Sequence, residues 1–108
     1  MNVRLTSAAE DDVTHGYAWY EERKDGLGLE FIERVEQAIG KIVKSLLGHK
    51  RVIRDARKCE LEQFPYALWY IAESEEDSIV IGCLHGKRDR VLAKERALGV
   101  IEMPRQKP

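Results

Sequence analysis

Apolar residues in the first half of the chain recur at the spacing of amphipathic helices. The motif Ser7-Ala8-Ala9-Glu10 has the spacing of a capping box, which predicts a helix directly after a short alternating strand at residues 2–6. Basic residues followed by Gly26 predict the end of this helix. The helix face that we expect to be buried carries Ala9, Val13, Tyr17 and Tyr20.

A second helix is predicted from about Leu29 to Leu47, with Gly48 as its C-terminal stop. Its apolar residues recur every three or four positions, from Phe31 to Leu46, so that one face is expected to be buried. Because the loop between the two helices is short, we expect them to lie antiparallel as a hairpin.

In the second half of the chain the spacing of apolar residues changes from the helical period to the period of two that is typical of strands. Cys59 and Leu61 alternate with charged residues, and Tyr66–Ile71 is a continuous apolar run typical of a strand buried on both faces. An acidic turn separates this run from a further strand at Ser78–His85. The order of elements predicts an α+β fold (βααβββ), in which the helix hairpin covers a three- to four-stranded antiparallel sheet.

The residues beyond the last strand predict a short helical tail. Val91–Leu98 would form it, Gly99 would interrupt it, and Pro104–Pro108 is expected to fray. We therefore divide the chain into one domain at 1–90 and a C-terminal extension at 91–108.

Composition adds few constraints. A length of 108 residues fits a single domain, and 34% charged residues with a formal net charge of -1 give the chain no overall attraction to nucleic acid. No apolar run approaches the ~20 residues of a membrane span, and the start of the chain has no signal-peptide core. We expect a cytoplasmic protein with no membrane partner.

Cysteine and histidine usage predicts neither a disulfide nor a cofactor. The strands that carry Cys59 and Cys83 should flank the Tyr66–Ile71 strand, which separates them by about 9.6 Å at ~4.8 Å per strand. A disulfide requires α-carbons within roughly 7 Å. The three histidines are scattered and no phosphate-binding glycine loop is present, so we expect no metal and no organic cofactor.

Several motifs together resemble the ParE/RelE superfamily of toxins. The resemblance covers about residues 2–89, and its motifs are Tyr17–Glu22, Gly26-Leu27-Gly28, Phe31–Glu36, Phe64-Pro65-Tyr66, Trp69-Tyr70, Ile79-Val80-Ile81 and His85-Gly86-Lys87-Arg88-Asp89. The resemblance implies a helix hairpin against an antiparallel sheet and a cognate antitoxin as partner. It also implies one of two targets, because ParE-like members inhibit DNA gyrase and RelE-like members cleave messenger RNA on the ribosome.

The central strands favour the ParE-like alternative, a binding toxin rather than an enzyme. RelE-like ribonucleases place cations on these strands, whereas no lysine or arginine occurs here between Lys58 and Lys87. His85 is the candidate acid or base if the chain is an endoribonuclease. The alternative is that His85 caps the end of its strand through local hydrogen bonds. A family member that is not toxic and only binds a partner is a third hypothesis.

Five basic residues are candidates for binding the target or a phosphate, namely Arg57, Lys58, Lys87, Arg88 and Arg90. They would form one patch if the start of the strand at Cys59 and the end of the last strand lay at the same edge. We expect these two ends to lie together, because strands one apart in a meander run parallel. The alternative is a solvated rim balanced by Asp89.

Aromatic residues supply the candidate antitoxin contacts. Alternation along Tyr66–Ile71 sends Trp69 to the face opposite Tyr70, so that one of the two faces away from the helices unless both faces are covered. An exposed aromatic side chain there would be an anchor, and we assign Trp69 and Trp19 to antitoxin binding. The sequence leaves open whether the protein forms a homodimer or a hetero-oligomer with its antitoxin.

Overall fold

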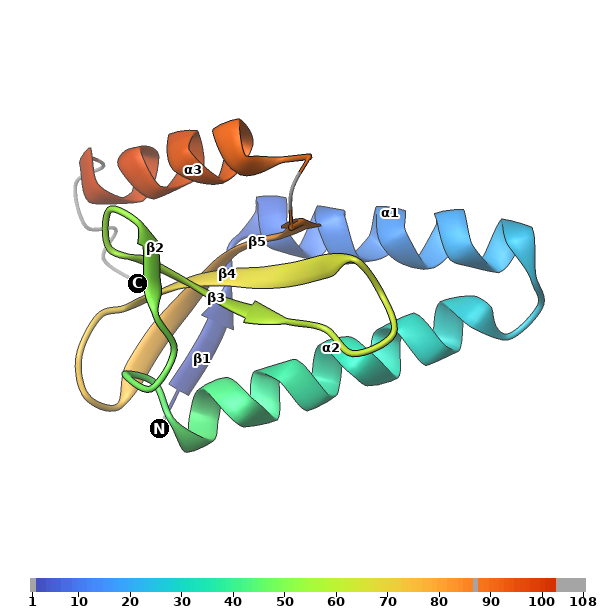
Figure 1. Cartoon of the computed structure of the whole chain (residues 1–108), viewed down its shortest axis with the longest axis horizontal. Helices are drawn as coiled ribbons and strands as arrows, with labels where there is room; N and C mark the ends of the chain where they lie inside the picture. The colour runs from blue at the N-terminus through green and yellow to red at the C-terminus, as the bar shows by residue number, and fades with distance from the viewer. Residues whose placement is uncertain (1, 87, 103–108) are drawn as a thin grey trace.

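The computed structural model describes residues 2–86 and 88–102 as three layers, a helix hairpin, a sheet and a C-terminal helix (Figure 1). Its elements are β1 (Asn2–Leu5), α1 (Ser7–Arg23), α2 (Leu27–Lys44), β2 (Arg51–Ile53), β3 (Ala56–Glu60), β4 (Tyr66–Ala72), β5 (Asp77–His85) and α3 (Arg90–Glu102). The expected α+β fold with a helix hairpin on a sheet is confirmed.

The sheet has five strands in the order β1-β5-β4-β3-β2, more than the three or four expected. β1 pairs with β5 in parallel, and the other neighbouring strands pair antiparallel. All elements from α1 to β4 lie between the two strands in sequence, which leaves ample chain for the crossover that a parallel pair requires. β2 escaped prediction because its three residues are too few to show a period.

Both helices of the hairpin differ from prediction at their ends. Thr6, one residue before the expected start, is the N-cap of α1, and its hydroxyl accepts a hydrogen bond from the Ala9 amide at 3.1 Å. α2 ends at Lys44 with Ser45 as C-cap, whereas Gly48 lies in a turn beyond it.

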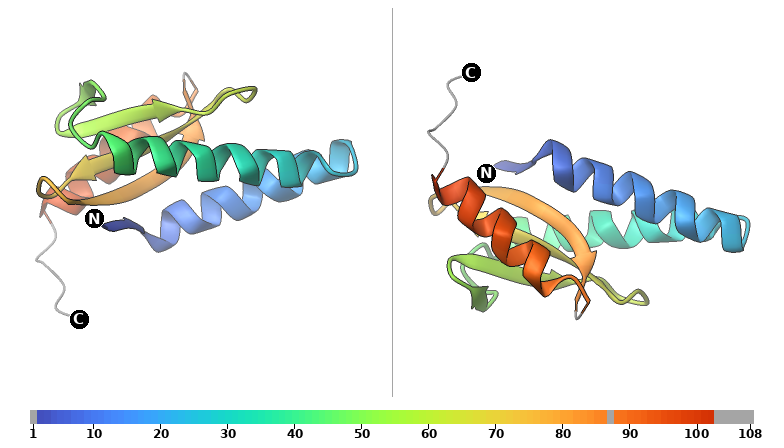
Figure 2. Two further views of the ribbon diagram at one scale, coloured as in Figure 1. Left: turned by 90° about the horizontal axis from the view of Figure 1, so that it is seen from below. Right: turned by 90° about the horizontal axis from the view of Figure 1, so that it is seen from above.

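Glycine determines how closely the two helices approach. A β-carbon at Gly16 of α1 would lie 2.6 Å from the ring of Phe31, and one at Gly28 of α2 would lie 2.8 Å from the carbonyl oxygen of Tyr17. Gly16 is therefore a buried position of α1 together with Ala9, while Tyr17 is 40% exposed, contrary to the predicted face. The tip of the hairpin projects past the sheet (Figure 2).

The Glu21 carboxylate closes the turn between the helices. It accepts hydrogen bonds from the amides of Gly26, at 3.1 and 3.2 Å, and of Gly28, at 3.0 Å. These amides belong to the N-terminus of α2, where unpaired N–H groups and the helix dipole favour an anion. The antiparallel arrangement expected from the short loop is thus held by a side chain of α1.

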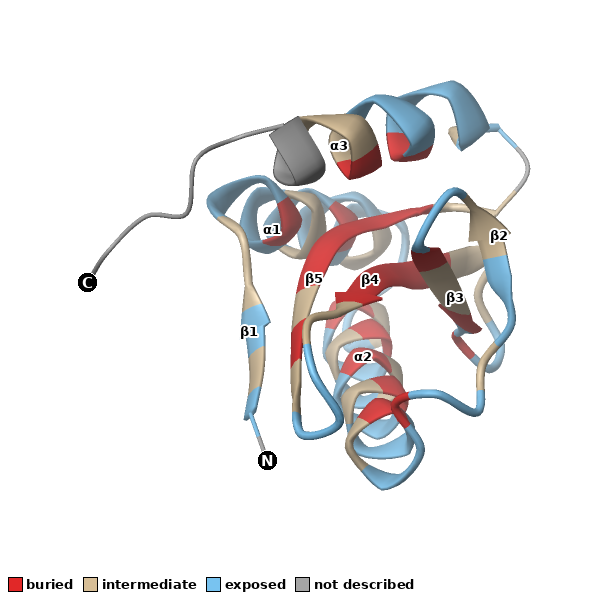
Figure 3. Cartoon of the chain, turned by 90° about the vertical axis from the view of Figure 1, so that its left-hand side faces the viewer, coloured by how far each residue is buried: buried red, intermediate tan, exposed pale blue. Residues whose placement is uncertain are grey.

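Two apolar cores lie on opposite faces of the sheet (Figure 3). The first, between the sheet and the hairpin, includes Phe31, Leu68 and Tyr70. The second, between the sheet and α3, includes Trp69, Ile81 and the two small residues Ala93 and Ala97. The expected tail is therefore largely a packed helix, and Gly99 does not interrupt it. Residues 104–108, expected to fray, lie outside the described residues.

The two cysteines remain free thiols, as predicted. Cys59 and Cys83 are both buried and lie on either side of β4, where each is paired in register with Leu68. Within the described residues, no helix has the length and apolarity needed to cross a membrane.

Candidate functional site

A groove of ≈240 Å³ runs between α1 and the end of β5, and it extends to the first turns of α3. We call it the α1–β5 groove. Its walls combine apolar side chains with charged ones, among them Asp12, Trp19, Tyr66, Arg88, Asp89 and Leu92. Two of the predicted site residues, Trp19 and Arg88, therefore share one groove although they are far apart in sequence.

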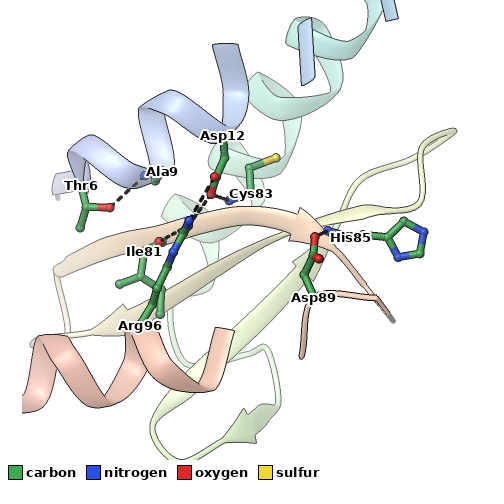
Figure 4. Close-up of polar contacts among 8 residues, drawn as sticks. All are labelled: Thr6, Ala9, Asp12, Ile81, Cys83, His85, Asp89 and Arg96. Atoms are coloured by element: carbon green, nitrogen blue, oxygen red, sulfur yellow. Dashed lines mark hydrogen bonds and ion pairs between the residues drawn. The ribbon is translucent and has the colours of Figure 1, made fainter. Parts of the chain in front are cut away.

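The groove follows the part of β5 that β1 leaves uncovered. β1 pairs with β5 only as far as Val80, whose carbonyl accepts a last hydrogen bond from the Thr6 amide at 3.0 Å. Beyond this point side chains satisfy the strand edge (Figure 4). The Cys83 amide donates to Asp12 Oδ2 at 3.0 Å, and the His85 amide donates to Asp89 Oδ2 at 3.1 Å. This edge of β5 is thus closed without a neighbouring strand.

Arg96 of α3 completes the closed edge and ties three elements together. Its guanidinium contacts both oxygens of Asp12, at 2.5 and 3.2 Å, and donates to the Ile81 carbonyl at 3.1 Å (Figure 4). The two side chains are only 20% and 15% exposed. A β-carbon at Gly82 would lie 2.7 Å from Arg96 Nη1. Glycine at this position therefore allows the guanidinium to lie against β5. Sequence reasoning missed Asp12 and Arg96, which lie 84 positions apart.

Trp19 is an exposed and rigidly held aromatic side chain. Its residue is 49% exposed, and the Arg23 guanidinium lies 3.3 Å from the centre of the indole ring. Arg23 also donates to the Trp19 carbonyl at 2.9 Å, and Tyr20 packs edge-on against the indole at 4.9 Å between centroids. A preordered, accessible indole suits a protein contact, because little side-chain entropy remains to be lost on binding. Its assignment to the antitoxin stays a prediction.

Trp69, the other predicted antitoxin anchor, is completely buried. It faces away from the hairpin and Tyr70 faces toward it, as alternation predicted. The expectation of an exposed aromatic side chain is nevertheless wrong here, because α3 covers the second face of the sheet with Ala93 and Ala97. The indole Nε1 has no hydrogen-bond partner among the described residues.

The predicted basic patch does not form as one surface. β3 and β5 run parallel, so the start of β3 lies beside the start of β5 and not beside its end. The register shows this, because Arg57 pairs with Tyr70, which in turn pairs with Val80, whereas His85 pairs with Tyr66 at the opposite end of β4. The expectation that Arg57 and Arg88 share an edge is therefore wrong.

Two members of the predicted patch have local contacts within the sheet and the loop before it. The Arg57 guanidinium donates to the carbonyls of Leu47 at 3.2 Å and His49 at 2.6 Å, which fixes the loop between α2 and β2. Lys58 Nζ lies 3.5 Å from a Glu60 carboxylate oxygen and 5.6 Å from the centre of the Trp69 indole ring.

Two of the remaining basic candidates, Arg88 and Arg90, line different grooves. Arg88 lines the α1–β5 groove with its side chain 65% exposed and 3.5 Å from Asp89, and the neighbouring Tyr66 hydroxyl and Asp89 raise the pKa of its guanidinium. Arg90 lines a separate groove with Arg54 and Lys94. Lys87 lies outside the described residues.

His85 lies at the end of β5 in a set of local contacts. Its Nδ1 accepts a hydrogen bond from the Arg88 amide at 3.0 Å, which places the proton of the neutral ring on Nε2. The ring packs edge-on against Tyr66 at 5.9 Å between centroids. These contacts match the interpretation of His85 as a strand-end cap, and they also bring a hydroxyl and a guanidinium near an imidazole. A catalytic role for His85 stays a prediction.

Among residues 2–86 and 88–102, no group of three histidine, cysteine or acidic side chains is arranged to hold a metal ion. The ionisable groups with large pKa shifts are instead buried side chains of the core. Burial, and secondarily the nearby Asp12, raises the pKa of the Cys83 thiol to about 12, and burial raises the pKa of Tyr70 to about 12.

These pKa values predict a loss of stability at high pH. Each group stays neutral in the folded chain after its unfolded form has begun to ionise, so its contribution is complete below pH 9 for Cys83 and below pH 10 for Tyr70, and is lost as pH rises toward about 12. We expect the free energy of unfolding, measured with urea, to fall over this range. The fall should be smaller in Cys83→Ala, and an identical pH profile for this variant would contradict the assignment to Cys83.

A scan against protein-family models finds no match, and no curated protein matches the sequence. Among solved structures, one chain of "Chromosomal ParDE TA system from P. aeruginosa" is similar, with a TM-score of 0.56 and 17% sequence identity. The match covers 79% of this chain and 95% of that chain. At this identity the likeness establishes the fold, and it confirms the fold expected from the ParE/RelE resemblance.

Proposed function

We propose that this chain is the toxin of a toxin–antitoxin pair, a ParE-like inhibitor of DNA gyrase that acts in the cytoplasm and is neutralised by a cognate antitoxin. The shared fold with a chain of a ParDE system supports the toxin class. The α1–β5 groove supports action by binding, because it offers a rigid exposed indole, Trp19, beside the exposed cation of Arg88.

The observation that carries the choice of a binding toxin is the burial of β4 and β5 on both faces. Leu68, Tyr70 and Val80 lie under the hairpin, and Trp69, Ile81 and Leu84 lie in the core under α3. Phosphodiester cleavage requires cations around the scissile phosphate, and one lost donor of this kind typically costs about 10²–10³ in rate. The central strands present apolar side chains to both layers and no such cation.

One observation favours the alternative of a RelE-like, ribosome-dependent messenger RNA endoribonuclease. Tyr66 and Arg88 line the α1–β5 groove, and His85, which does not line it, contacts the Tyr66 ring and the Arg88 amide, so that a hydroxyl, an imidazole and a guanidinium lie near one another. An acid–base pair with a cation is the minimum set for general acid–base cleavage of RNA. This cluster makes the two functions separable by mutation.

The test is controlled expression of the chain in a bacterial host, with growth, the DNA-damage response and protein synthesis followed after induction. We expect growth arrest with a DNA-damage response, and inhibition of gyrase supercoiling by the purified protein. Trp19→Ala with Arg88→Glu should abolish both effects, because the groove reverses a charge and loses the indole, which in this proposal contacts gyrase as well as the antitoxin. His85→Gln keeps hydrogen-bonding capacity without titration and should retain both effects.

Two outcomes would overturn this proposal. Rapid arrest of translation with messenger RNA cleavage that disappears in folded His85→Gln protein would establish the ribonuclease instead. Unchanged growth at high expression in several hosts would leave a non-toxic member of the fold that only binds a partner.

A further inference from the structure

A second groove, of ≈470 Å³, lies between α3 and the hairpin of β2 and β3. We call it the α3–β2 groove, and we treat it as separate from the α1–β5 groove because no described residue lines both. Its lining consists of three aliphatic and three basic residues, Val52, Ile53, Val91, Arg54, Arg90 and Lys94.

The three cations of this groove have no counter-ion among the described residues. All three residues are exposed, and none of them forms an ion pair within the described ranges 2–86 and 88–102. Asp55, the acid next to Arg54 in sequence, instead lies 3.6 Å from Arg51 and does not line the groove. A concentration of positive charge is thus present in a chain whose formal net charge is -1.

The aliphatic residues give the groove an apolar floor. Val52 and Ile53 are partly buried and pack against the second core, whereas Val91 on α3 is 72% exposed. Single exposed aliphatic residues are common, but this one borders a groove whose floor is already apolar. Covering Val91 would remove apolar surface from water, which is favourable for any partner that brings its own apolar side chain.

The combination of floor and rim distinguishes a peptide from a nucleic acid. A nucleic acid would engage the cations through its phosphates, but its bases stack on aromatic side chains, and none of the described residues that line this groove is aromatic. A peptide that alternates carboxylates with aliphatic side chains matches both parts of the groove. The chemistry of the described lining therefore selects the peptide.

We propose that the α3–β2 groove is a docking site for an acidic, amphipathic segment of a partner protein. Carboxylates of the segment lie among Arg54, Arg90 and Lys94, and one or two aliphatic side chains cover Val91 and the floor. This inference rests on the lining of the groove and does not depend on the proposed action on gyrase.

The experiment measures binding of short fluorescein-labelled peptides to the full chain by fluorescence anisotropy. The probes are a peptide of alternating glutamate and leucine, the same peptide with serine in place of leucine, and a single-stranded DNA oligonucleotide. We expect the glutamate–leucine peptide to bind most tightly. Arg90→Glu with Lys94→Glu should weaken its binding about tenfold or more, because two attractive rim charges become repulsive.

Matched variants separate a defined site from diffuse attraction. Lys24→Glu with Lys50→Glu reverses two exposed cations outside the groove and should change the affinity by less than about twofold. Val91→Ser should weaken binding of the glutamate–leucine peptide and leave binding of the glutamate–serine peptide unchanged. Circular dichroism establishes that each variant is folded.

Three results would overturn the proposal. Equal losses in the two charge-reversal variants would indicate attraction by overall charge alone. Tighter binding of the oligonucleotide, lost in Arg90→Glu with Lys94→Glu, would indicate a nucleic-acid surface. Failure of the glutamate–leucine peptide to reach saturation, while growth inhibition persists, would remove the docking site and leave the toxin proposal intact.

Discussion

Replacing Trp69 with alanine is expected to lower the free energy of unfolding by about 3–5 kcal/mol. The indole is completely buried between the sheet and α3, and its neighbours Ala93 and Ala97 are too small to fill the space it would leave. The free energy of unfolding of a natural domain is only about 5–15 kcal/mol, so the variant should unfold at moderate urea concentration. Urea titration followed by circular dichroism measures the loss.

Trp69→Phe is the matched control for this prediction. Phenylalanine keeps an aromatic ring in the core and removes the Nε1 proton that has no partner among the described residues, so its cost should be clearly smaller. The pair also tests the earlier assignment of Trp69 to the antitoxin. A Trp69→Ala protein that stays as stable as the parent but no longer binds an antitoxin would show that Trp69 is an anchor and that α3 moves aside.

Removing either partner of the Asp12–Arg96 ion pair should cost about 2–4 kcal/mol. Arg96→Met leaves the largely buried Asp12 charge without its cation and the Ile81 carbonyl without its donor, and Asp12→Asn removes the charge that holds Arg96. Because both substitutions break the same contact, the double variant should lose less than the sum of the single losses. Urea unfolding of all four proteins gives the coupling.

An exposed pair serves as the comparison for this cycle. Lys41 and Glu62 lie 3.0 Å apart with side chains 48% and 62% exposed, and breaking this pair should change stability little because water screens both charges. If Asp12→Asn and Arg96→Met were strictly additive, or no more costly than Lys41→Met, the closed edge of β5 would not depend on the ion pair.

The spacing of apolar residues predicted the helix hairpin and the two central strands, because each of these elements has its own apolar pattern. The continuous run at Tyr66–Ile71 even indicated that both faces of β4 need a cover. The second cover could not be recognised, because α3 packs through Ala93 and Ala97 while the larger Val91 and Leu92 are exposed. A helix that packs through small residues shows no apolar stripe in its sequence, so its buried face cannot be recognised.

The site was less accessible to prediction than the fold because its residues meet only through long-range pairing. Trp19 and Arg88 were singled out from their residue types, but nothing local in the sequence places them in one groove. The partnership of Asp12 with Arg96 depends on α1 and α3 meeting across β5. The basic patch failed for the same reason, since its formation depended on which ends of β3 and β5 are neighbours.

The sheet order also governs when a newly made chain can fold. β1 is synthesised first, yet its partner is β5, and the paired residues Asn2 and Asp77 are 77 − 2 = 75 positions apart. At about 5–20 residues per second, roughly 4–15 s of synthesis separate the two strands. Throughout that interval β1 has no strand to pair with, although β3 and β4 become available to the hairpin before β5 does. A growing chain can therefore complete its five-stranded sheet only after β5 has been made.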